Sequence, residues 1–305
     1  MSVIIFGSIN MDLVARTPRL PAPGETLTGH TFEMIPGGKG ANQAVAVARL
    51  GIPTTLVGRV GNDSFGQTLL QGLKTDRIAC DPVLVDHSTH SGVAVIAVDD
   101  ASENNIIVIP GANGNIETSD VDRLRSLLPQ FQVLLLQLEI PLPAVISAAQ
   151  AAKEAGVTVI LDPAPAQSNL PAELYPLIDI ITPNQVETSQ LVSFPVKDLE
   201  TAHQAALVLQ QRGVQTVITK LGKLGALCLT GSETLQVPIF PVQAVDTVAA
   251  GDAFNGGLAA GLAEGLPLAQ AVTQATAVAA LSVTKAGAQP SLPTREELNT
   301  FLAQH

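Results

Sequence analysis

A run of small residues precedes an aspartate near the C-terminal end of the chain. The stretch DTVAAGDAFNGG, at 246–257, places Ala249, Ala250 and Gly251 directly before Asp252. Apolar residues then recur at helical spacing, so we expect a helix to begin here, with unpaired first amides that favour negative charge. The small residues would leave these amides open as an anion hole, and Asp252 would be a base for an attacking hydroxyl. The alternative is that Asp252 only caps the helix, which gives no reason for three small residues before it.

A second glycine-rich stretch, GGKGAN at 37–42, has the composition of a phosphate-binding loop but lacks its spacing. The pattern GxxxxGK[ST] needs a leading glycine that is missing here, and Gly40 follows the lysine. We expect a small-residue helix after this stretch. Gly37 and Gly38 would then present backbone amides that bind hydroxyls or an anion. An ordinary tight turn is the alternative at this point.

Five apolar runs of strand length supply a framework for these residues. The runs lie at 2–7, 133–138, 157–161, 178–182 and 216–219. They are continuously apolar rather than alternating, which is typical of strands that are buried on both faces. Helical patterns that end at glycine lie between them, at 142–156 and 198–213. The alternation predicts an α/β fold, a three-layer α/β/α architecture with a mostly parallel sheet, built as a single domain over 1–305.

Two stretches break this alternation. Residues 12–34 carry prolines and polar turns, and 91–110 is typical of a hairpin with a polar turn at DDASENN. Neither supplies a helix that would wrap the main sheet. We expect both to contribute to a small β-sheet that covers one end of the domain as a lid.

Polar residues follow the predicted strands at the edge where ligands bind in open parallel sheets. Because the carboxyl ends of parallel strands meet at one rim, we expect these residues to form a binding site there. They are Asn10, Asp12, Glu139, Asn184, Glu187 and the stretch KLGKLG at 220–225.

The composition excludes several classes of protein. A hydrophobic content of 46% over 305 residues supports a large core, and no segment has the roughly 20 consecutive apolar residues of a membrane span. The net charge of −11 and the lack of a Lys/Arg cluster argue against nucleic acid as a partner, but not against a small phosphorylated ligand. The N-terminus is typical of a first strand and not of a signal peptide, and only two cysteines are present. We therefore expect a cytoplasmic protein.

The chain resembles the ribokinases, members of the PfkB group of sugar and nucleoside kinases, essentially from end to end. Two glycine-rich signatures in the same order make this resemblance specific. The segments that carry it are GSINMD at 7–12, GGKGANQAVA at 37–46, GRVGNDSFG at 58–66, QLEIP at 137–141, TPNQVE at 182–187, VDTVAAGDAFNGGL at 245–258 and KAGAQPS at 285–291. The resemblance implies ATP-dependent phosphorylation of the 5-hydroxyl of D-ribose, which gives D-ribose 5-phosphate and ADP.

The resemblance also implies a role for each matching position. Asp252 would be the base, with the anion hole formed by Ala249, Ala250 and Gly251. The residues implied to bind the sugar are Asn10, Met11, Asp12, Gly38, Lys39, Gly40, Ala41, Asn42, Glu139 and Asp252. The residues implied to bind ATP are Asn184, Lys220, Leu221, Gly222, Lys223, Leu224, Gly225, Gly251, Asp252 and Thr276.

Metal ions and a second copy of the chain are implied in the same way. Asn184 and Glu187 form the NxxE element associated with Mg²⁺ and phosphate, an indirect role for Glu187. A monovalent cation, K⁺, would be bound by Asp246, Val248, Ser282, Lys285, Gly287 and Ser291. The lid strands would form a homodimer interface. Two positions depart from the expected pattern, because Lys220 stands where ribokinases often have threonine and Thr276 where asparagine is common.

Other functions remain open at this point. A kinase of the same family could act on deoxyribose, fructose or a nucleoside such as adenosine. A nucleoside needs an aromatic surface, whereas aromatic residues make up 3% of the chain and the one tyrosine, Tyr175, lies outside the predicted site, which favours a free sugar. A non-catalytic sugar sensor would have no use for Asp252 as a base, and a dinucleotide-binding dehydrogenase would need GxGxxG after the first strand.

Overall fold

The larger of two β-sheets runs through the middle of the molecule. The structure is a computed structural model that describes residues 1–101, 103–231 and 233–305. Within these residues the sheet has nine strands, in the order β13-β12-β11-β10-β9-β8-β1-β4-β5. Their bounds are β1 (Val3–Phe6), β4 (Thr54–Gly61), β5 (Val83–Asp86), β8 (Val133–Leu136), β9 (Thr158–Leu161), β10 (Ile180–Ile181), β11 (Thr216–Lys220), β12 (Ala226–Thr230) and β13 (Glu233–Val237). The strands from β5 to β11 in this order are parallel, and β12 pairs antiparallel with both β11 and β13.

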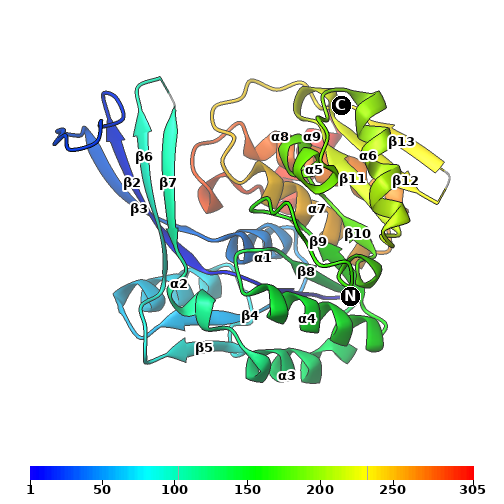
Figure 1. Cartoon of the computed structure of the whole chain (residues 1–305), viewed down its shortest axis with the longest axis horizontal. Helices are drawn as coiled ribbons and strands as arrows, with labels where there is room; N and C mark the ends of the chain where they lie inside the picture. Colours follow the sequence, from blue (N-terminus) through cyan, green and yellow to red (C-terminus); the bar gives the residue numbers. More distant parts are fainter. Residues whose placement is uncertain (102, 232) are drawn as a thin grey trace.

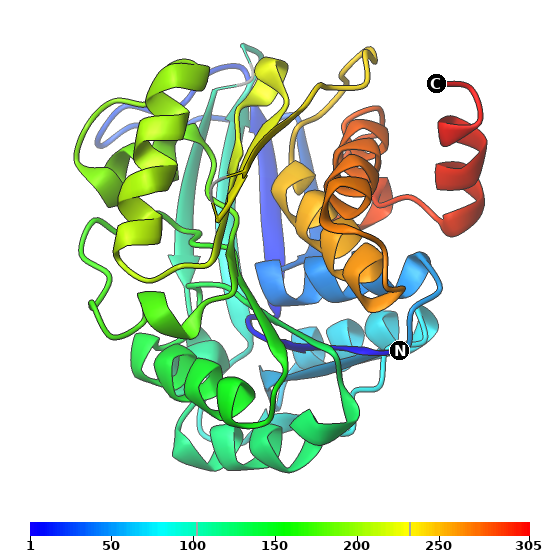
Figure 2. The same cartoon turned by 90° about the vertical axis from the view of Figure 1, so that its right-hand side faces the viewer.

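Helices cover both faces of this sheet, which confirms the predicted three-layer α/β/α fold (Figure 2). On one face lie α1 (Lys39–Arg49), α2 (Ser64–Thr75), α7 (Ala250–Ala263), α8 (Leu268–Ser282) and α9 (Arg295–Leu302). On the other lie α3 (Thr118–Leu127), α4 (Leu142–Glu154), α5 (Gln185–Val192) and α6 (Leu199–Gln211). None of the helices in the described part of the chain is long and apolar enough to cross a membrane.

The first strand shows why the core strands are apolar throughout. Val3 and Ile5 of β1 pack into the hydrophobic core beneath α1 and α7, while Ile4 and Phe6 pack into the core beneath α4 and α6. Because successive side chains point to opposite faces, a strand covered on both sides needs apolar residues at every position. All four side chains are fully buried.

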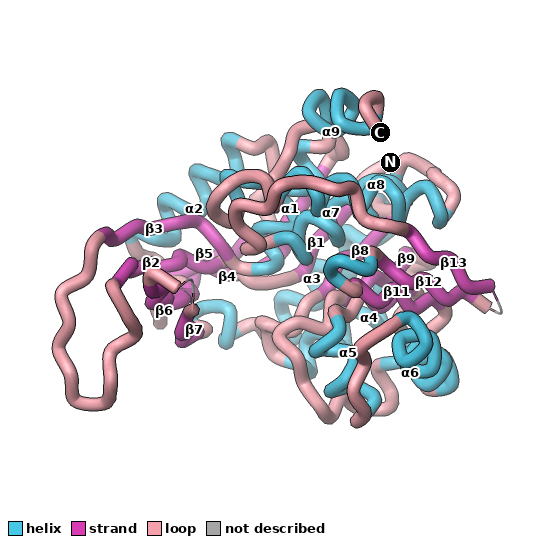
Figure 3. The backbone as a smooth tube through the Cα atoms, turned by 90° about the horizontal axis from the view of Figure 1, so that it is seen from above, coloured by secondary structure: helices cyan, strands magenta, loops and turns pink. Residues whose placement is uncertain are grey.

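A second sheet of four strands stands apart from the main body, at the left of Figure 1, and Figure 3 shows it from above. Its strands are β2 (Asn10–Thr17), β3 (Thr31–Gly37), β6 (Gly92–Asp99) and β7 (Asn104–Ile109), in the order β3-β2-β6-β7. The hairpin expected over 91–110 is present as β6 and β7, although Ser102 of its predicted turn lies outside the described residues. We call these four strands the lid sheet; its action as a lid stays a prediction.

The lid sheet extends further along the chain than the sequence suggested. Strand β2 begins at Asn10 rather than after residue 12, and β3 continues to Gly37 rather than stopping near residue 34. Strand β3 therefore leads almost directly into α1, which begins at Lys39. The glycine-rich stretch at 37–42 is consequently the junction between the lid sheet and the main body.

Candidate active site

Helix α7 begins at Ala250, as the sequence predicted. The residue before it, Ala249, has φ 59°, in the left-handed region that residues other than glycine rarely adopt. No side chain caps the N-terminus of α7, so the alternative that Asp252 caps this helix is wrong. The Ala250 amide donates to the carbonyl of Thr247 at 3.3 Å. The amides of Ala249, Gly251 and Asp252 have no hydrogen-bond acceptor within the described chain. This end of the helix has open donors, as an anion hole requires.

The glycines of the stretch 246–257 serve two different purposes. A Cβ atom on Gly256 would lie 2.3 Å from the side chain of Ala46 in α1, and one on Gly257 would lie 2.9 Å from the Cα atom of Ala275 in α8. These two glycines therefore allow the neighbouring helices to pack closely against α7. A Cβ atom on Gly251 would instead meet only Lys220 Nζ, at 3.4 Å. The absence of a side chain there leaves the start of the helix accessible from the side of Lys220.

The carboxylate of Asp252 is held by two amide side chains from α1. Asn42 Nδ2 donates to one carboxylate oxygen at 3.0 Å, and Gln43 Nε2 donates to the other at 3.1 Å. Burial raises the pKa of Asp252, and the nearby Lys39 opposes this shift. A buried carboxylate with a raised pKa, fixed by hydrogen bonds beside open amides, has the properties of a general base.

The N-terminus of α1 uses its amides within the chain. Gly38 precedes the helix with φ 85°, and a Cβ atom there would lie 2.7 Å from a backbone nitrogen of β2, so this close approach requires glycine. The amide of Lys39 donates to Glu139 Oε2 at 3.0 Å, and that of Ala41 donates to the carbonyl of Ser8 at 2.9 Å. The predicted helix is present, but these first amides are not open to a ligand.

A group of polar side chains gathers where the lid sheet meets the main body. Asn10 is buried and its Oδ1 accepts a hydrogen bond of 2.7 Å from Asn113 Nδ2. Burial raises the pKa of Asp12 to about 7, with further contributions from the negative charges of Glu139 and Asp252. Hydroxyl groups of a sugar can both donate to carboxylates and accept from amides, so this group suits such a ligand.

Lys39 is the positive charge at the centre of these carboxylates. Burial lowers its pKa, but the negative charges of Asp252, Asp162, Glu139 and Glu187 outweigh that effect, so the pKa of Lys39 is raised. Met11 and Ala41 do not belong to this polar group, because their side chains lie in the hydrophobic core. Their predicted contact with a sugar would have to come from the backbone.

A cavity of about 900 Å³ opens on the other side of Asp252. Its lining combines charged side chains and the start of α7 with apolar residues. The lining includes Lys39, Asp162, Asn184, Glu187, Lys220, Gly222, Lys223, Gly225, Ile239, Phe240, Ala249, Ala250, Gly251, Asp252 and Thr276. Most of the predicted ATP residues are thus brought together. Leu221 is instead buried in the core, and Leu224 is exposed outside the cavity.

The NxxE element has a structural role at the start of α5. Asn184 Oδ1 accepts from the Glu187 amide at 2.9 Å, and Glu187 in return accepts from the backbone and side-chain nitrogens of Asn184. This capping box fixes both side chains at the cavity wall. Burial raises the pKa of Glu187, while Lys220 opposes the shift.

Sequence reasoning missed two buried residues that connect these groups. Asp162 accepts a hydrogen bond from Gln43 at 3.0 Å and forms an ion pair with Lys220 at 3.0 Å. Asp162 follows the apolar run at 157–161, as the other rim residues follow theirs, so the same rule would have found it. Gln43 has no such signal, because its importance arises from packing of α1 against α7.

The residues predicted to hold a monovalent cation lie on two adjacent segments next to α7. Asp246 accepts from the Gly287 amide at 2.9 Å and from the Val248 amide at 3.0 Å, and the amides of Val245 and Asp246 both donate to the carbonyl of Val283. The side chain of Lys285 is paired with Glu297 and contributes no oxygen. Among the described residues, no group of three or more His, Cys, Asp or Glu side chains could hold a metal ion.

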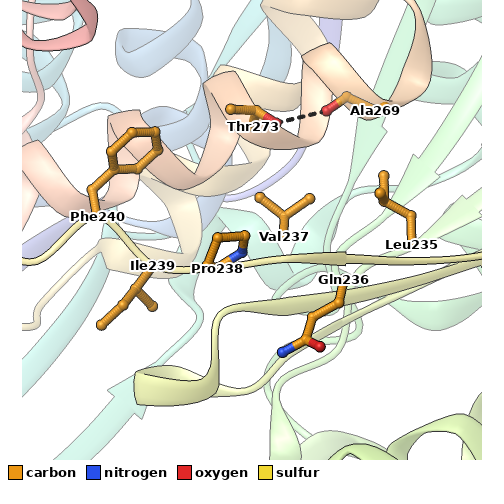
Figure 4. Close-up of a pocket in the computed structure, with 8 residues that line it drawn as sticks. All are labelled: Leu235, Gln236, Val237, Pro238, Ile239, Phe240, Ala269 and Thr273. Atoms are coloured by element: carbon orange, nitrogen blue, oxygen red, sulfur yellow. Dashed lines mark hydrogen bonds between the residues drawn. The ribbon is translucent and has the colours of Figure 1, made fainter. Parts of the chain in front are cut away.

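A smaller hollow of about 180 Å³ lies between β13 and α8, and Figure 4 shows the residues that line it. They are mostly apolar, and Thr273 donates its hydroxyl hydrogen to the Ala269 carbonyl in its own helix. Ile239 and Phe240 also line the larger cavity. This hollow has no charged side chain, so we assign it no chemistry.

Comparisons with known proteins show the family to which the chain belongs. The model of the pfkB family carbohydrate kinases matches residues 1–295. A ribokinase of Haemophilus influenzae is 42% identical over 99% of this chain and 98% of its own length, and a deoxyribokinase of Salmonella typhi is 37% identical over 99% of both. A solved structure of Arabidopsis thaliana ribokinase complexed with ribose and ATP is 35% identical, with a TM-score of 0.91, and the match covers 99% of this chain and 98% of that one. The chain belongs to the PfkB family of carbohydrate kinases.

Proposed function

We propose that the protein transfers the terminal phosphoryl group of ATP to the 5-hydroxyl of D-ribose. The observation that carries this proposal is the position of Asp252. Its carboxylate receives hydrogen bonds from Asn42 and Gln43 of α1, and Asp252 also lines the cavity that contains most of the predicted nucleotide residues. A base at this position can accept the hydroxyl proton as the oxygen attacks the phosphorus atom.

In this proposal each group of side chains has its own task. Asn10, Asp12 and Glu139 bind the sugar hydroxyls, and Asn113 orients Asn10 for that contact. The 5-hydroxyl then points at Asp252. The open amides at the start of α7 stabilise the negative charge that develops on the transferring group, because donors fixed in a buried site do not have to reorganise during the reaction.

Two metal ions fit the residues present. Mg²⁺ keeps much of its water and binds phosphates with one or two carboxylates, which agrees with a cavity wall that offers Glu187 but no three-ligand group among the described residues. Mg²⁺ would supply charge neutralisation at the phosphates. K⁺ prefers oxygen ligands, and Asp246 with the carbonyls of the segments 245–248 and 282–291 would provide them. Asp246 also ties these segments together.

A homodimer through the lid sheet is part of the same proposal. Large apolar side chains are exposed on this sheet, among them Phe32, Met34, Ile106 and Ile107. Phe32 and Met34 lie on β3, and Ile106 and Ile107 lie on β7, the two outer strands of the sheet. Large exposed apolar side chains on one small sheet favour a surface that another molecule covers. A second copy of the chain would bury them.

A deoxyribose kinase is the second candidate, because the deoxyribokinase of Salmonella typhi is also similar over the full length. A coupled assay of ADP release with ribose, 2-deoxyribose, fructose and adenosine separates the candidates. We expect the highest kcat/KM for ribose, because buried polar groups left without a partner penalise an analogue that lacks a hydroxyl. A higher kcat/KM for any of the other three would contradict the proposal, and no ADP release with any of them would favour a sugar sensor.

A further inference from the structure

Lys220 stands at the end of β11, where it faces the nucleotide cavity. Its Nζ atom lies 3.0 Å from Asp162 Oδ1, and the side chain is only 15% exposed. The same ammonium group lies 3.4 Å from the position that a Cβ atom of Gly251 would occupy. Lys220 therefore places a positive charge directly beside the open end of α7.

The surroundings of this ammonium group leave it able to bind an anion. An ammonium group has three donors, and the contact with Asp162 uses one of them. Asp162 is also bound by Gln43, so it does not depend on Lys220 alone for a partner. Two other lysines, Lys39 and Lys223, also line the cavity. Lys39 comes from α1 and is surrounded by four carboxylates, and Lys223 is exposed. Lys220 is thus the lysine best placed for a ligand at the start of α7.

We propose that Lys220 binds the terminal phosphate of the nucleotide and remains in contact with it during transfer. This inference rests on the proposed function, which brings ATP into the cavity, and adds to it a residue that supplies charge to the transferring group. The amides of Gly251 and Asp252 have no acceptor among the described residues, and the ammonium group of Lys220 lies next to Gly251. Asp162 orients Lys220 by holding its side chain across the cavity.

The direct test is calorimetric titration with ATP, ADP and adenosine. Lys220→Met keeps the length of the side chain and removes its charge. We expect about tenfold or greater loss of ATP affinity, because a charge-assisted hydrogen bond is lost, a smaller loss for ADP and no change for adenosine. Lys220→Arg should retain most of the ATP affinity. Lys197→Met, at an exposed position away from the cavity, is the matched control.

A purely structural role for Lys220 predicts other results. If the lysine only neutralised Asp162, the affinities for all three ligands would fall together, and the double variant Lys220→Met/Asp162→Asn would recover ATP binding. We expect no such recovery, and either structural result would overturn the inference. The test of Lys220 can fail or succeed independently of the proposed function. Wild-type protein that binds ATP through Lys220 but phosphorylates no ribose would contradict only the proposed function, whereas a ribose kinase with normal ATP affinity in Lys220→Met would contradict only this inference.

Discussion

The side-chain amide of Gln43 donates a hydrogen bond of 3.1 Å to the carboxylate of Asp252, across 209 positions of sequence. The same nitrogen also donates to Asp162 at 3.0 Å, and the side-chain oxygen of Gln43 accepts from Gln137 at 2.7 Å. The Gln43 side chain is completely buried. One amide group therefore fixes the proposed base and connects it to the carboxylate that holds Lys220.

Replacement of Gln43 by methionine should slow catalysis without abolishing substrate binding. The variant keeps the length of the side chain but cannot donate to Asp252, so we expect kcat to fall about tenfold while the KM values change little. A hydrogen bond donated to a carboxylate lowers its pKa, and its loss raises the pKa of Asp252 further. The acidic limb of the kcat/KM profile should therefore move to higher pH. An unmoved profile would show that Gln43 has only a packing role.

Ribose binding should depend on pH through Asp12. Burial and the charges of Glu139 and Asp252 raise the pKa of Asp12 to about 7, so this carboxylate becomes protonated as the pH falls through that value. A protonated carboxyl group is a weaker acceptor for sugar hydroxyls, and the Kd for ribose should increase below pH 7. Calorimetry from pH 5.5 to 8.5 would measure this. The Asp12→Asn variant should bind more weakly at pH 8 and show a flatter profile; a profile as steep as that of the wild type would exclude Asp12 as the titrating group.

The same shift has a consequence for stability. A carboxylate whose pKa is raised in the folded state stabilises the fold at low pH relative to high pH, and that advantage is lost as the pH rises through about 7. Asp12→Asn removes the buried charge, so we expect its Tm to exceed that of the wild type at pH 8. At pH 5, where folded Asp12 is protonated, the gain should be smaller. Thermal unfolding at the two pH values gives the comparison, and a gain of equal size at both would refute it.

The sequence predicted the central strands better than the edges of the sheet. Strands β1 and β8 are apolar at every position, and β9 at every position after Thr158, because helices cover both of their faces. Strand β13 is largely exposed at the edge and contains polar residues, so it forms no apolar run that could be recognised. The run at 178–182 is the opposite case, since only Ile180–Ile181 pairs with its neighbours. Burial on two faces, rather than strand formation itself, produced the signal.

The candidate site shows a similar division. Asp252 and the start of α7 could be predicted because small residues and helical spacing are local features. The partners of Asp252 could not, because Asn42 and Gln43 reach it only through the packing of α1 on α7. The acceptors of the first α1 amides were also unpredictable, since Ser8 and Glu139 reach these amides from the loops after β1 and β8.

Removal of monovalent cations should lower turnover. Asp246 joins the segment before α7 to the segment after α8, and an ion bound there would fix the loop that carries the open amides. We expect kcat to be several-fold higher in KCl than in choline chloride of the same ionic strength. Asp246→Ala should lose this difference. Equal turnover of the wild type in the two salts would contradict the proposed cation site.

Shortening the lid sheet should uncouple ATP use from sugar phosphorylation. Strand β6 begins beside Asn10, one of the residues proposed to bind the sugar, since a Cβ atom on Gly92 would lie 2.1 Å from Asn10 Oδ1. A variant in which Asn-Gly replaces residues 97–105 keeps a hairpin but removes its outer half. Because phosphoryl transfer must exclude water, we expect a higher KM for ribose and more ATP hydrolysed for each sugar phosphate formed. An unchanged ratio of ADP to sugar phosphate would argue against a lid.

Asp252 is the centre of the proposed mechanism, and Asp252→Asn tests it with the smallest change of shape. Asparagine cannot accept the proton of the 5-hydroxyl, and its single oxygen can accept from Asn42 or Gln43 but not from both with full geometry. Thermal unfolding and calorimetry with ribose and ATP would establish that the variant is folded and binds both substrates.

The deciding measurement is kcat of Asp252→Asn with ribose and ATP at saturating concentrations. General-base catalysis contributes on the order of 10²–10⁴ in rate, so we predict that kcat falls by roughly that factor while the Kd values for ribose and ATP change far less. A kcat within a few-fold of the wild type, in a variant that is folded and binds both substrates, would contradict the assignment of Asp252 as the base.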